Sequence, residues 1–194
     1  MTETRQSLRR ELRAARRALT PAQQRAAAAG LARQLRRLLP LLHAQHIAFY
    51  LPNDGEIDPR PFVRFLEQRG KRCYLPRLYP GDTQRVWFIR YRSGDALEKN
   101  CYGIPEPLLR GERLPAALLQ VVLMPLVGFD RAGNRLGMGG GFYDRTFAFR
   151  AWRKNSRPLL VGLAHSVQEV PALPVEAWDM PLDVIATESI LIRM

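Results

Sequence analysis

Four glycines lie within five positions of the stretch RLGMGGGFYDR (residues 135–145): Gly137, Gly139, Gly140 and Gly141. Glycine loses more conformational entropy on folding than any other residue, so such a run indicates a backbone that turns sharply or approaches a ligand closely. Backbone N–H groups left uncovered by glycine at the start of a helix form a cradle for anions. The stretch therefore favours a phosphate-binding loop, with a plain glycine-rich turn as the alternative.

Charged and aromatic residues flank this loop. Arg135 and Arg145 can neutralise phosphate charge, and Asp144 can either cap the following helix or hold Mg²⁺ against bound phosphates. Arg145 and its neighbour Tyr143 are the candidate catalytic residues, although Arg145 could instead be a surface helix residue. The loop is not GxxxxGK[ST], and it lacks the third glycine of a dinucleotide-binding GxGxxG.

Further acidic residues could contribute to a site. Glu56 lies in a loop after the first predicted strand, where it would bind a substrate by accepting hydrogen bonds from its donors. Asp54 and Asp58 are expected to serve as turn and cap residues. Asp179 and Asp183 lie near the last predicted strand, and either could be a second acidic ligand of a metal.

Several types of chemistry have no signature in this sequence. There is no Gly-x-Ser-x-Gly motif, and the three histidines are scattered at positions 43, 46 and 165. Cys73 and Cys101 form no CxxC pattern, so we expect reduced, partly buried thiols and no zinc site. A covalent nucleophile is not expected, whereas phosphoryl transfer by positioning and Mg²⁺ requires none.

The positive charge is concentrated near the N-terminus. The chain has a net charge of +12, and its first 37 residues contain ten arginines against two glutamates, which is +8 of that total. Such a segment could bind nucleic acid, a membrane surface or a polyanionic small molecule. A solvated helix face is the simpler interpretation, because arginine far outnumbers lysine throughout the chain.

The length of 194 residues fits one domain, residues 1–194. No apolar run approaches the roughly 20 residues that span a bilayer. The N-terminus lacks the apolar core of a secretory signal. We therefore expect a cytoplasmic protein, monomeric and without a membrane partner.

Helical patterns begin the chain. Leu8, Leu12, Ala15 and Leu19 form one apolar stripe over residues 5–19. A capping box with Thr20 and Gln23 predicts a second helix over 20–39, ending near Pro40. Further helices are predicted over 58–70, with Asp58 as cap and Gly70 as terminator, and over about 143–153.

Short apolar runs predict strands between these helices, at 46–51, 71–76, 85–91, 120–126, 158–164 and 183–189. Alternating strands and helices predict an open, mostly parallel α/β sheet with helices on both faces, a three-layer Rossmann-like arrangement preceded by two N-terminal helices. The loops after strands 46–51, 71–76 and 120–126 should then gather at the carboxyl edge of the sheet, where ligands bind in such folds.

Residues 125–145, PLVGFDRAGNRLGMGGGFYDR, closely resemble the signature of the 5-formyltetrahydrofolate cyclo-ligase (5,10-methenyltetrahydrofolate synthetase) family. The similarity extends in order over nearly the whole chain, through RQSLRRELRAARRAL (5–19), YLPNDGEID (50–58), GKRCYLPR (70–77), YGIPEP (102–107) and ALPVEAWDMPLDVIATE (172–188). The resemblance implies conversion of 5-formyltetrahydrofolate to 5,10-methenyltetrahydrofolate. The folate substrate can carry a polyglutamate tail. ATP is then the co-substrate, Mg²⁺ the cofactor, and ADP and phosphate are released.

The resemblance also implies roles for individual residues. It assigns Asp144 and Asp179 to Mg²⁺, and Leu51 and Glu56 to the folate, together with loop residues 138–142 (Met138, Gly139, Gly140, Gly141 and Phe142). ATP would contact Arg5, Arg9 and the loop from 135 to 143, namely Arg135, Leu136, Gly137, Met138, Gly139, Gly140, Gly141, Phe142 and Tyr143.

Two other functions compete with this one. A different nucleotide-dependent α/β kinase or transferase could use the same loop. A basic nucleic-acid-binding protein is less well supported, because no recognition motif is present and aromatic residues do not interleave with the basic run. No nucleic-acid partner is expected.

Overall fold

The computed structural model describes residues 4–79, 82–152, 157–176 and 178–194. Its centre is an eight-stranded sheet in the order β12-β11-β10-β7-β1-β2-β3-β6. Pairing is parallel from β11 to β2 and antiparallel for β12–β11, β2–β3 and β3–β6. The strands are β1 (His46–Ala48), β2 (Arg72–Tyr79), β3 (Asp82–Arg90), β6 (Arg113–Leu114), β7 (Val121–Pro125), β10 (Leu159–Leu163), β11 (Val184–Ala186) and β12 (Leu191–Arg193).

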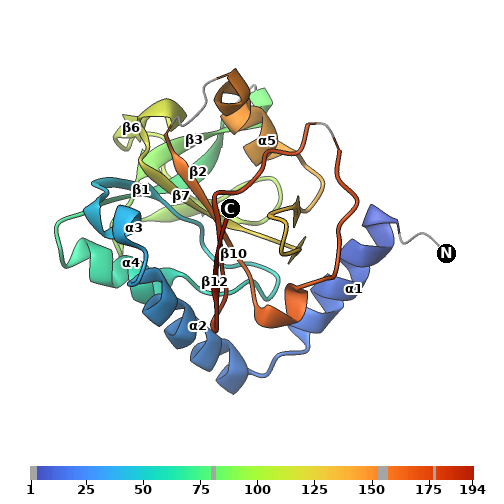
Figure 1. Cartoon of the computed structure of the whole chain (residues 1–194). Coiled ribbons are helices and arrows are strands. Elements are labelled where there is room, and N and C mark those ends of the chain that lie inside the picture. The colour runs from blue at the N-terminus through green and yellow to red at the C-terminus, as the bar shows by residue number, and fades with distance from the viewer. Residues whose placement is uncertain (1–3, 80–81, 153–156, 177) are drawn as a thin grey trace.

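Helices cover both faces of this sheet (Figure 1). On one face, α2 (Pro21–Leu35), α3 (Leu39–His43) and α4 (Arg60–Glu67) bury leucines and Phe62 against the strands. On the other face, α5 (Phe142–Phe147) and the 3₁₀ segments η1 (Ala116–Leu118) and η2 (Ala148–Trp152) form a second layer, with Phe147 packed among residues of β7 and β10. The predicted open α/β architecture with helices on both faces is therefore confirmed.

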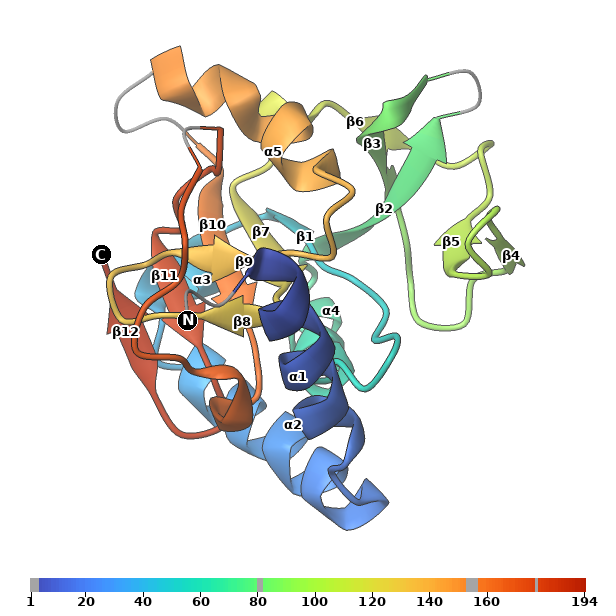
Figure 2. The same ribbon diagram turned by 90° about the vertical axis from the view of Figure 1, so that its right-hand side faces the viewer.

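The first helix, α1 (Arg5–Arg17), has a different position from the others. Leu8 and Leu12 pack with Val127, Leu136 and Leu173 in a separate small core. This core joins α1 to the hairpin of β8 (Gly128–Phe129) and β9 (Arg135–Leu136), and α1 also contacts η3 (Ser166–Gln168). Figure 2 shows α1 lying beside the hairpin, which follows the carboxyl end of β7 in the chain. The helix is thus placed next to the predicted ligand edge.

Local signals located several helix ends correctly. The capping box of Thr20 and Gln23 is present, and Gly70 follows α4 with a φ of 72°. The second helix, however, ends at Leu35, earlier than predicted, and Pro40 lies in the first turn of α3. Proline is tolerated in a first turn because its missing N–H has no helical partner there. The predicted helix after the glycine loop changes from α-helix to 3₁₀ at Ala148.

The structure contains short strands that the sequence patterns did not predict. β8 and β9 form a hairpin within a predicted loop, and β12 adds an antiparallel edge strand. β4 (Leu97–Lys99) and β5 (Pro105–Pro107) form a small separate sheet. The predicted loop after residue 76 is largely strand, because β2 continues to Tyr79.

Cys73 is buried as expected, but Cys101 is exposed, so that part of the thiol prediction was wrong. No helix in the described ranges is long and apolar enough to cross a membrane.

Candidate active site

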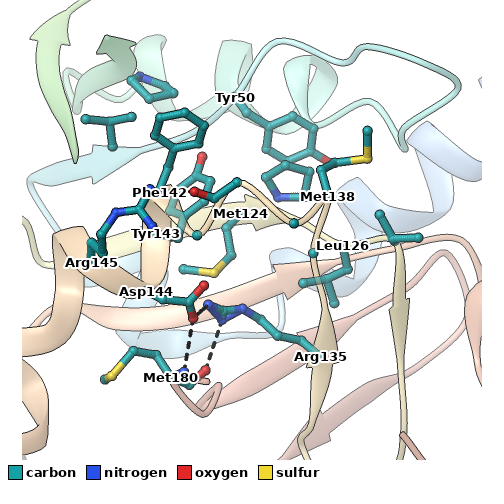
Figure 3. Close-up of a pocket in the computed structure, with 18 of the residues that line it drawn as sticks. Tyr50, Met124, Leu126, Arg135, Met138, Phe142, Tyr143, Asp144, Arg145 and Met180 are labelled. Carbon is teal, nitrogen blue, oxygen red and sulfur yellow. Dashed lines mark hydrogen bonds and ion pairs between the residues drawn. The ribbon is translucent and has the colours of Figure 1, made fainter. Parts of the chain in front are cut away.

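A cleft of about 1370 Å³ opens at the carboxyl ends of the central parallel strands. Its walls include the Asn53–Glu56 loop after β1, the glycine loop after β9, and Leu75, Pro76 and Leu78 of β2. The predicted convergence of three loops is therefore confirmed, except that the middle one is a strand. Figure 3 shows residues of the glycine loop and of α5 that line this cleft, together with Tyr50.

The glycine loop has the backbone that its composition indicated. Gly139 has a φ of 97°, and Gly141, the N-cap of α5, has a φ of 63°. Both values lie in the left-handed region that residues with a Cβ seldom adopt. The Arg9 Nε donates to the Gly137 oxygen at 2.8 Å, and the Arg145 guanidinium donates to the Gly140 oxygen. Two cationic side chains therefore lie against the loop.

Arg135 and Asp144 form an ion pair at the base of the loop (Figure 3). Arg135 also donates to the Met180 oxygen at 2.9 Å, while Asp144 Oδ1 accepts from the Met180 N–H at 3.1 Å. The Arg135 side chain is only 8% exposed. These bonds connect β9, α5 and the segment before β11 on one side of the cleft.

Asp179 is held by Arg5 from the first turn of α1. The Arg5 guanidinium donates to both carboxylate oxygens, at 2.6 and 3.1 Å. Although desolvation opposes it, the hydrogen bond from Arg5 lowers the pKa of Asp179 below its usual value. Asp183 lies outside the cleft lining and pairs with Arg150. Of the two acidic candidates left open by the sequence, Asp179 is the one that lines the cleft.

Mg²⁺ would have to share this site with arginines. Within the described ranges, no three His, Cys, Asp or Glu side chains converge as a ready metal site. Mg²⁺ in phosphoryl-transfer sites commonly uses one or two carboxylates together with substrate phosphates and water. Asp144 and Asp179, both in the cleft lining, fit that mode and do not fit an all-protein metal cage.

Glu56 lies on the opposite wall and is largely withdrawn from water, its side chain being 11% exposed. Its Oε2 accepts from the Asn53 N–H at 3.1 Å. Burial raises the pKa of Glu56 to about 7, against the opposing charge of Arg16. A carboxylate poised between its charged and neutral forms is typical of functional sites.

The remaining predicted residues differ in position. Leu51, Met138, Phe142 and Tyr143 line the cleft, and burial raises the pKa of Tyr143. Leu136 does not line the cleft, because its fully buried side chain packs under α1. Leu136 is the residue of β9 that faces the small core beneath α1, so its side chain points away from the cleft.

Sequence reasoning missed a cluster of charged side chains next to Glu56, of which Arg16 is fully buried. Asp54 was expected to be a turn residue, and its φ of 54° agrees with a turn. Its carboxylate also accepts hydrogen bonds from three arginines of α1: Arg13, Arg16 and Arg17. The spacing of these arginines by three and four residues, one helical face, was the signal that could have indicated a common partner.

The fold and the cleft define an α/β protein whose cleft, at the carboxyl edge of a parallel sheet, has a wall of glycines and arginines. The model of the 5-formyltetrahydrofolate cyclo-ligase family matches residues 1–188, and the chain belongs to this family.

Curated relatives and solved structures agree with this assignment. The chain is 41% identical to the 5-formyltetrahydrofolate cyclo-ligase of Haemophilus influenzae over 93% of this chain and 96% of that protein. It is 42% identical to that of Escherichia coli K12, over 92% and 97% of the two chains. The NMR structure of Aquifex aeolicus 5,10-methenyltetrahydrofolate synthetase superposes with a TM-score of 0.82 at 31% identity, covering 97% and 92% of the two chains.

Proposed function

We propose that this protein converts 5-formyltetrahydrofolate to 5,10-methenyltetrahydrofolate at the expense of ATP, with Mg²⁺ as cofactor. The observation that carries the proposal is the coincidence of family and site. The family match spans residues 1–188, and the cleft at the sheet edge is lined by nearly all of the residues that the family resemblance assigns to ligands.

The arginine-rich wall suits a nucleoside triphosphate. Arg5, Arg9, Arg135 and Arg145 all line the cleft around the glycine loop. A guanidinium binds phosphate oxygens in a fixed, two-pronged geometry and keeps its charge at neutral pH. We assign the phosphates of ATP to this wall, with Asp144 and Asp179 near the metal ion that accompanies them.

The opposite wall suits the folate. Glu56 can accept two hydrogen bonds from adjacent N–H donors of a pterin ring, and Leu51 and Tyr50 supply apolar surface beside it. Met138 and Phe142, at the glycine loop, also line the cleft. A cleft of about 1370 Å³ exceeds the size of an ordinary single-ligand pocket, which agrees with two substrates bound side by side.

The chemistry requires alignment more than a protein nucleophile. The formyl oxygen of the substrate attacks the γ-phosphorus of ATP, and ADP departs. N10 then attacks the activated formyl carbon and loses its proton, and phosphate leaves with the former formyl oxygen. Bound at the phosphates, Mg²⁺ would neutralise charge on the transferred group. The arginines hold the phosphates in line, and Arg145 and Tyr143 border the point where the two substrates meet.

The direct experiment mixes purified protein with 5-formyltetrahydrofolate, ATP and Mg²⁺ and follows the near-ultraviolet absorbance of the methenyl product. We expect that absorbance to grow only when both ATP and Mg²⁺ are present, with one ADP formed per product. A flat trace from folded protein that binds ATP would favour another nucleotide-dependent transferase. Salt-sensitive binding to RNA or DNA without turnover would favour the nucleic-acid alternative.

A further inference from the structure

Arg16, in the last turn of α1, is a completely buried arginine in the cleft wall that carries Glu56. Its Nε donates to the Asp54 backbone oxygen at 2.8 Å, Nη1 to the Leu126 oxygen at 3.1 Å and Nη2 to Asp54 Oδ2 at 2.9 Å. Burying a guanidinium costs several kcal/mol unless hydrogen bonds and an opposite charge compensate. Here one side chain joins α1, the Glu56 loop and the end of β7.

The Glu56 loop is fitted closely to α1 at this point. Asp54 and Gly55 are consecutive left-handed residues, with φ of 54° and 77°. A Cβ added at Gly55 would lie 3.2 Å from the Arg16 backbone oxygen, which is tighter than most real Cβ contacts. The loop therefore has little freedom to shift while Arg16 keeps its three contacts.

Arg16 also provides positive charge close to Glu56. Its Nη2 lies 3.8 Å from Glu56 Oε1, too far for a hydrogen bond but close for a charge pair. The other charged or titratable groups acting on Glu56 are Arg13 on α1 and Asp54 on the loop itself, and Glu56 in turn acts on Tyr50 after β1 and Tyr143 on α5. His165, at the start of η3, touches the Gly55 oxygen.

We propose that Arg16 is a positioning residue for substrate binding: it fixes the loop that carries Glu56 and favours the charged form of that carboxylate, which accepts the N–H donors of the folate. This inference rests on the proposed function. It assigns to the C-terminal turn of α1 a task on the folate side, in addition to the task of its N-terminal turn at the phosphates.

The test measures the dissociation constant of 5-formyltetrahydrofolate by isothermal titration calorimetry, without ATP, at pH 7 and pH 9. The variants are Arg16→Met and Arg16→Lys. The matched control is Arg17→Ala, which removes an arginine from the same helix and the same Asp54 carboxylate. Arg17 is 54% exposed and, within the described ranges, makes no hydrogen bond or ion pair with Glu56.

Removing the charge of Arg16 should raise the pKa of Glu56 above its value of about 7. If the pKa of Glu56 rises by about one, the ionised fraction of Glu56 falls about fivefold at pH 7 and by less than about 1.5-fold at pH 9. We therefore expect Arg16→Met to weaken binding about fivefold or more at pH 7 and clearly less at pH 9. Arg16→Lys should recover part of the loss, and Arg17→Ala should stay within about twofold of the wild-type affinity.

Equal losses at pH 7 and pH 9, or no loss at either, would overturn the inference, because a merely structural arginine has no reason to act through the charge of Glu56. If Arg16→Met does not fold, Arg16→Lys carries the test: affinity at pH 7 equal to that of Arg17→Ala would overturn it. Failure of the wild-type protein to bind 5-formyltetrahydrofolate would refute the proposed function, and the inference with it.

Discussion

Glu56 is a carboxylate that folding has placed where its charge is costly. Its side chain is 11% exposed, and burial raises its pKa to about 7, compared with 4.5 in water. The folded state therefore binds a proton more tightly than the unfolded state does. A residue kept under these conditions reduces stability near neutral pH, and a requirement for ligand binding would explain why it is there.

Replacing Glu56 by Gln should stabilise the protein increasingly as pH rises. Because the folded pKa lies above the unfolded one, wild-type stability falls between about pH 4.5 and pH 7 and stays lower above it. Gln cannot ionise, so the advantage of Glu56→Gln should reach up to about 3 kcal/mol at pH 8 and vanish near pH 4. Urea unfolding at the two pH values measures it. A difference that does not change with pH would contradict the raised pKa.

Asp144 connects the structural and the proposed catalytic tasks. It pairs with Arg135 and accepts from the Met180 N–H, so Asp144→Asn keeps one acceptor and loses the charge. We expect a cost of about 1–3 kcal/mol in the free energy of unfolding and a fall in kcat of about a hundredfold or more, with a higher Mg²⁺ requirement, from loss of metal binding.

The control for this variant is Asp183→Asn, which removes an arginine-paired carboxylate that does not line the cleft. It should lose stability to a similar extent but retain its Mg²⁺ requirement. Activity titrations with Mg²⁺ at saturating ATP, together with urea unfolding, separate the two effects. Near-normal kcat in Asp144→Asn would remove the proposed metal role.

At the scale of elements, α1 is a short amphipathic helix that touches both walls of the cleft. Its apolar stripe, Leu8 and Leu12, packs against the hairpin that leads into the glycine loop. Arg5 and Arg9 then reach Asp179 and the glycine loop, and Arg16, at the other end of the helix, reaches the Glu56 loop. One packing contact thereby positions arginines on both walls, where the two proposed substrates would bind.

Arg9→Ala should raise the Michaelis constant for ATP about tenfold, because it removes a charge and releases the Gly137 carbonyl. The Michaelis constant for the folate should change much less. Arg10→Ala is the matched control, since Arg10 is the next residue of α1 and is exposed. Steady-state kinetics with each substrate varied in turn give the comparison. An ATP constant no different from that of Arg10→Ala would argue against a phosphate contact.

Elements were predictable where their signals are local. The capping box at Thr20, the glycine after α4 and the apolar runs of β7 and β10 all act over a few residues, and all appear in the structure. The antiparallel strand β12 and the hairpin β8–β9 were not predicted. Their stability comes from hydrogen bonds to partners and from tertiary packing, which a short two- or three-residue pattern does not show.

The candidate site follows the same division. The glycine loop and the Glu56 loop could be placed at one edge because parallel strands direct their carboxyl ends together. The pairing of Arg5 with Asp179, 174 residues apart, could not be read from composition or spacing. The cluster on Asp54 likewise depends on how α1 docks.

At the scale of the whole molecule, part of the positive charge that is concentrated near the N-terminus lies at the cleft. Ten of the arginines lie in the first 37 residues, and Arg5, Arg9 and Arg16 of this segment line the cleft. Further arginines, Arg10, Arg13 and Arg17, lie on the same helix. Both proposed substrates are anions. A positive field around the cleft opening should therefore raise the rate at which they are captured, as it does for other steered ligands.

If this field acts, salt should slow the binding of substrate but not the reaction of bound substrate. Raising KCl from about 50 to about 300 mM shortens the screening length from about 14 to about 6 Å, so long-range attraction weakens. We expect kcat/KM for ATP to fall about threefold or more while kcat changes by less than about 1.5-fold, because the bound phosphates lie against arginines too close to be screened. Stopped-flow mixing and steady-state rates measure the two quantities. A constant kcat/KM across this range would mean that the basic segment acts only through its direct contacts, and the arginines outside the cleft would then be a solvated helix face.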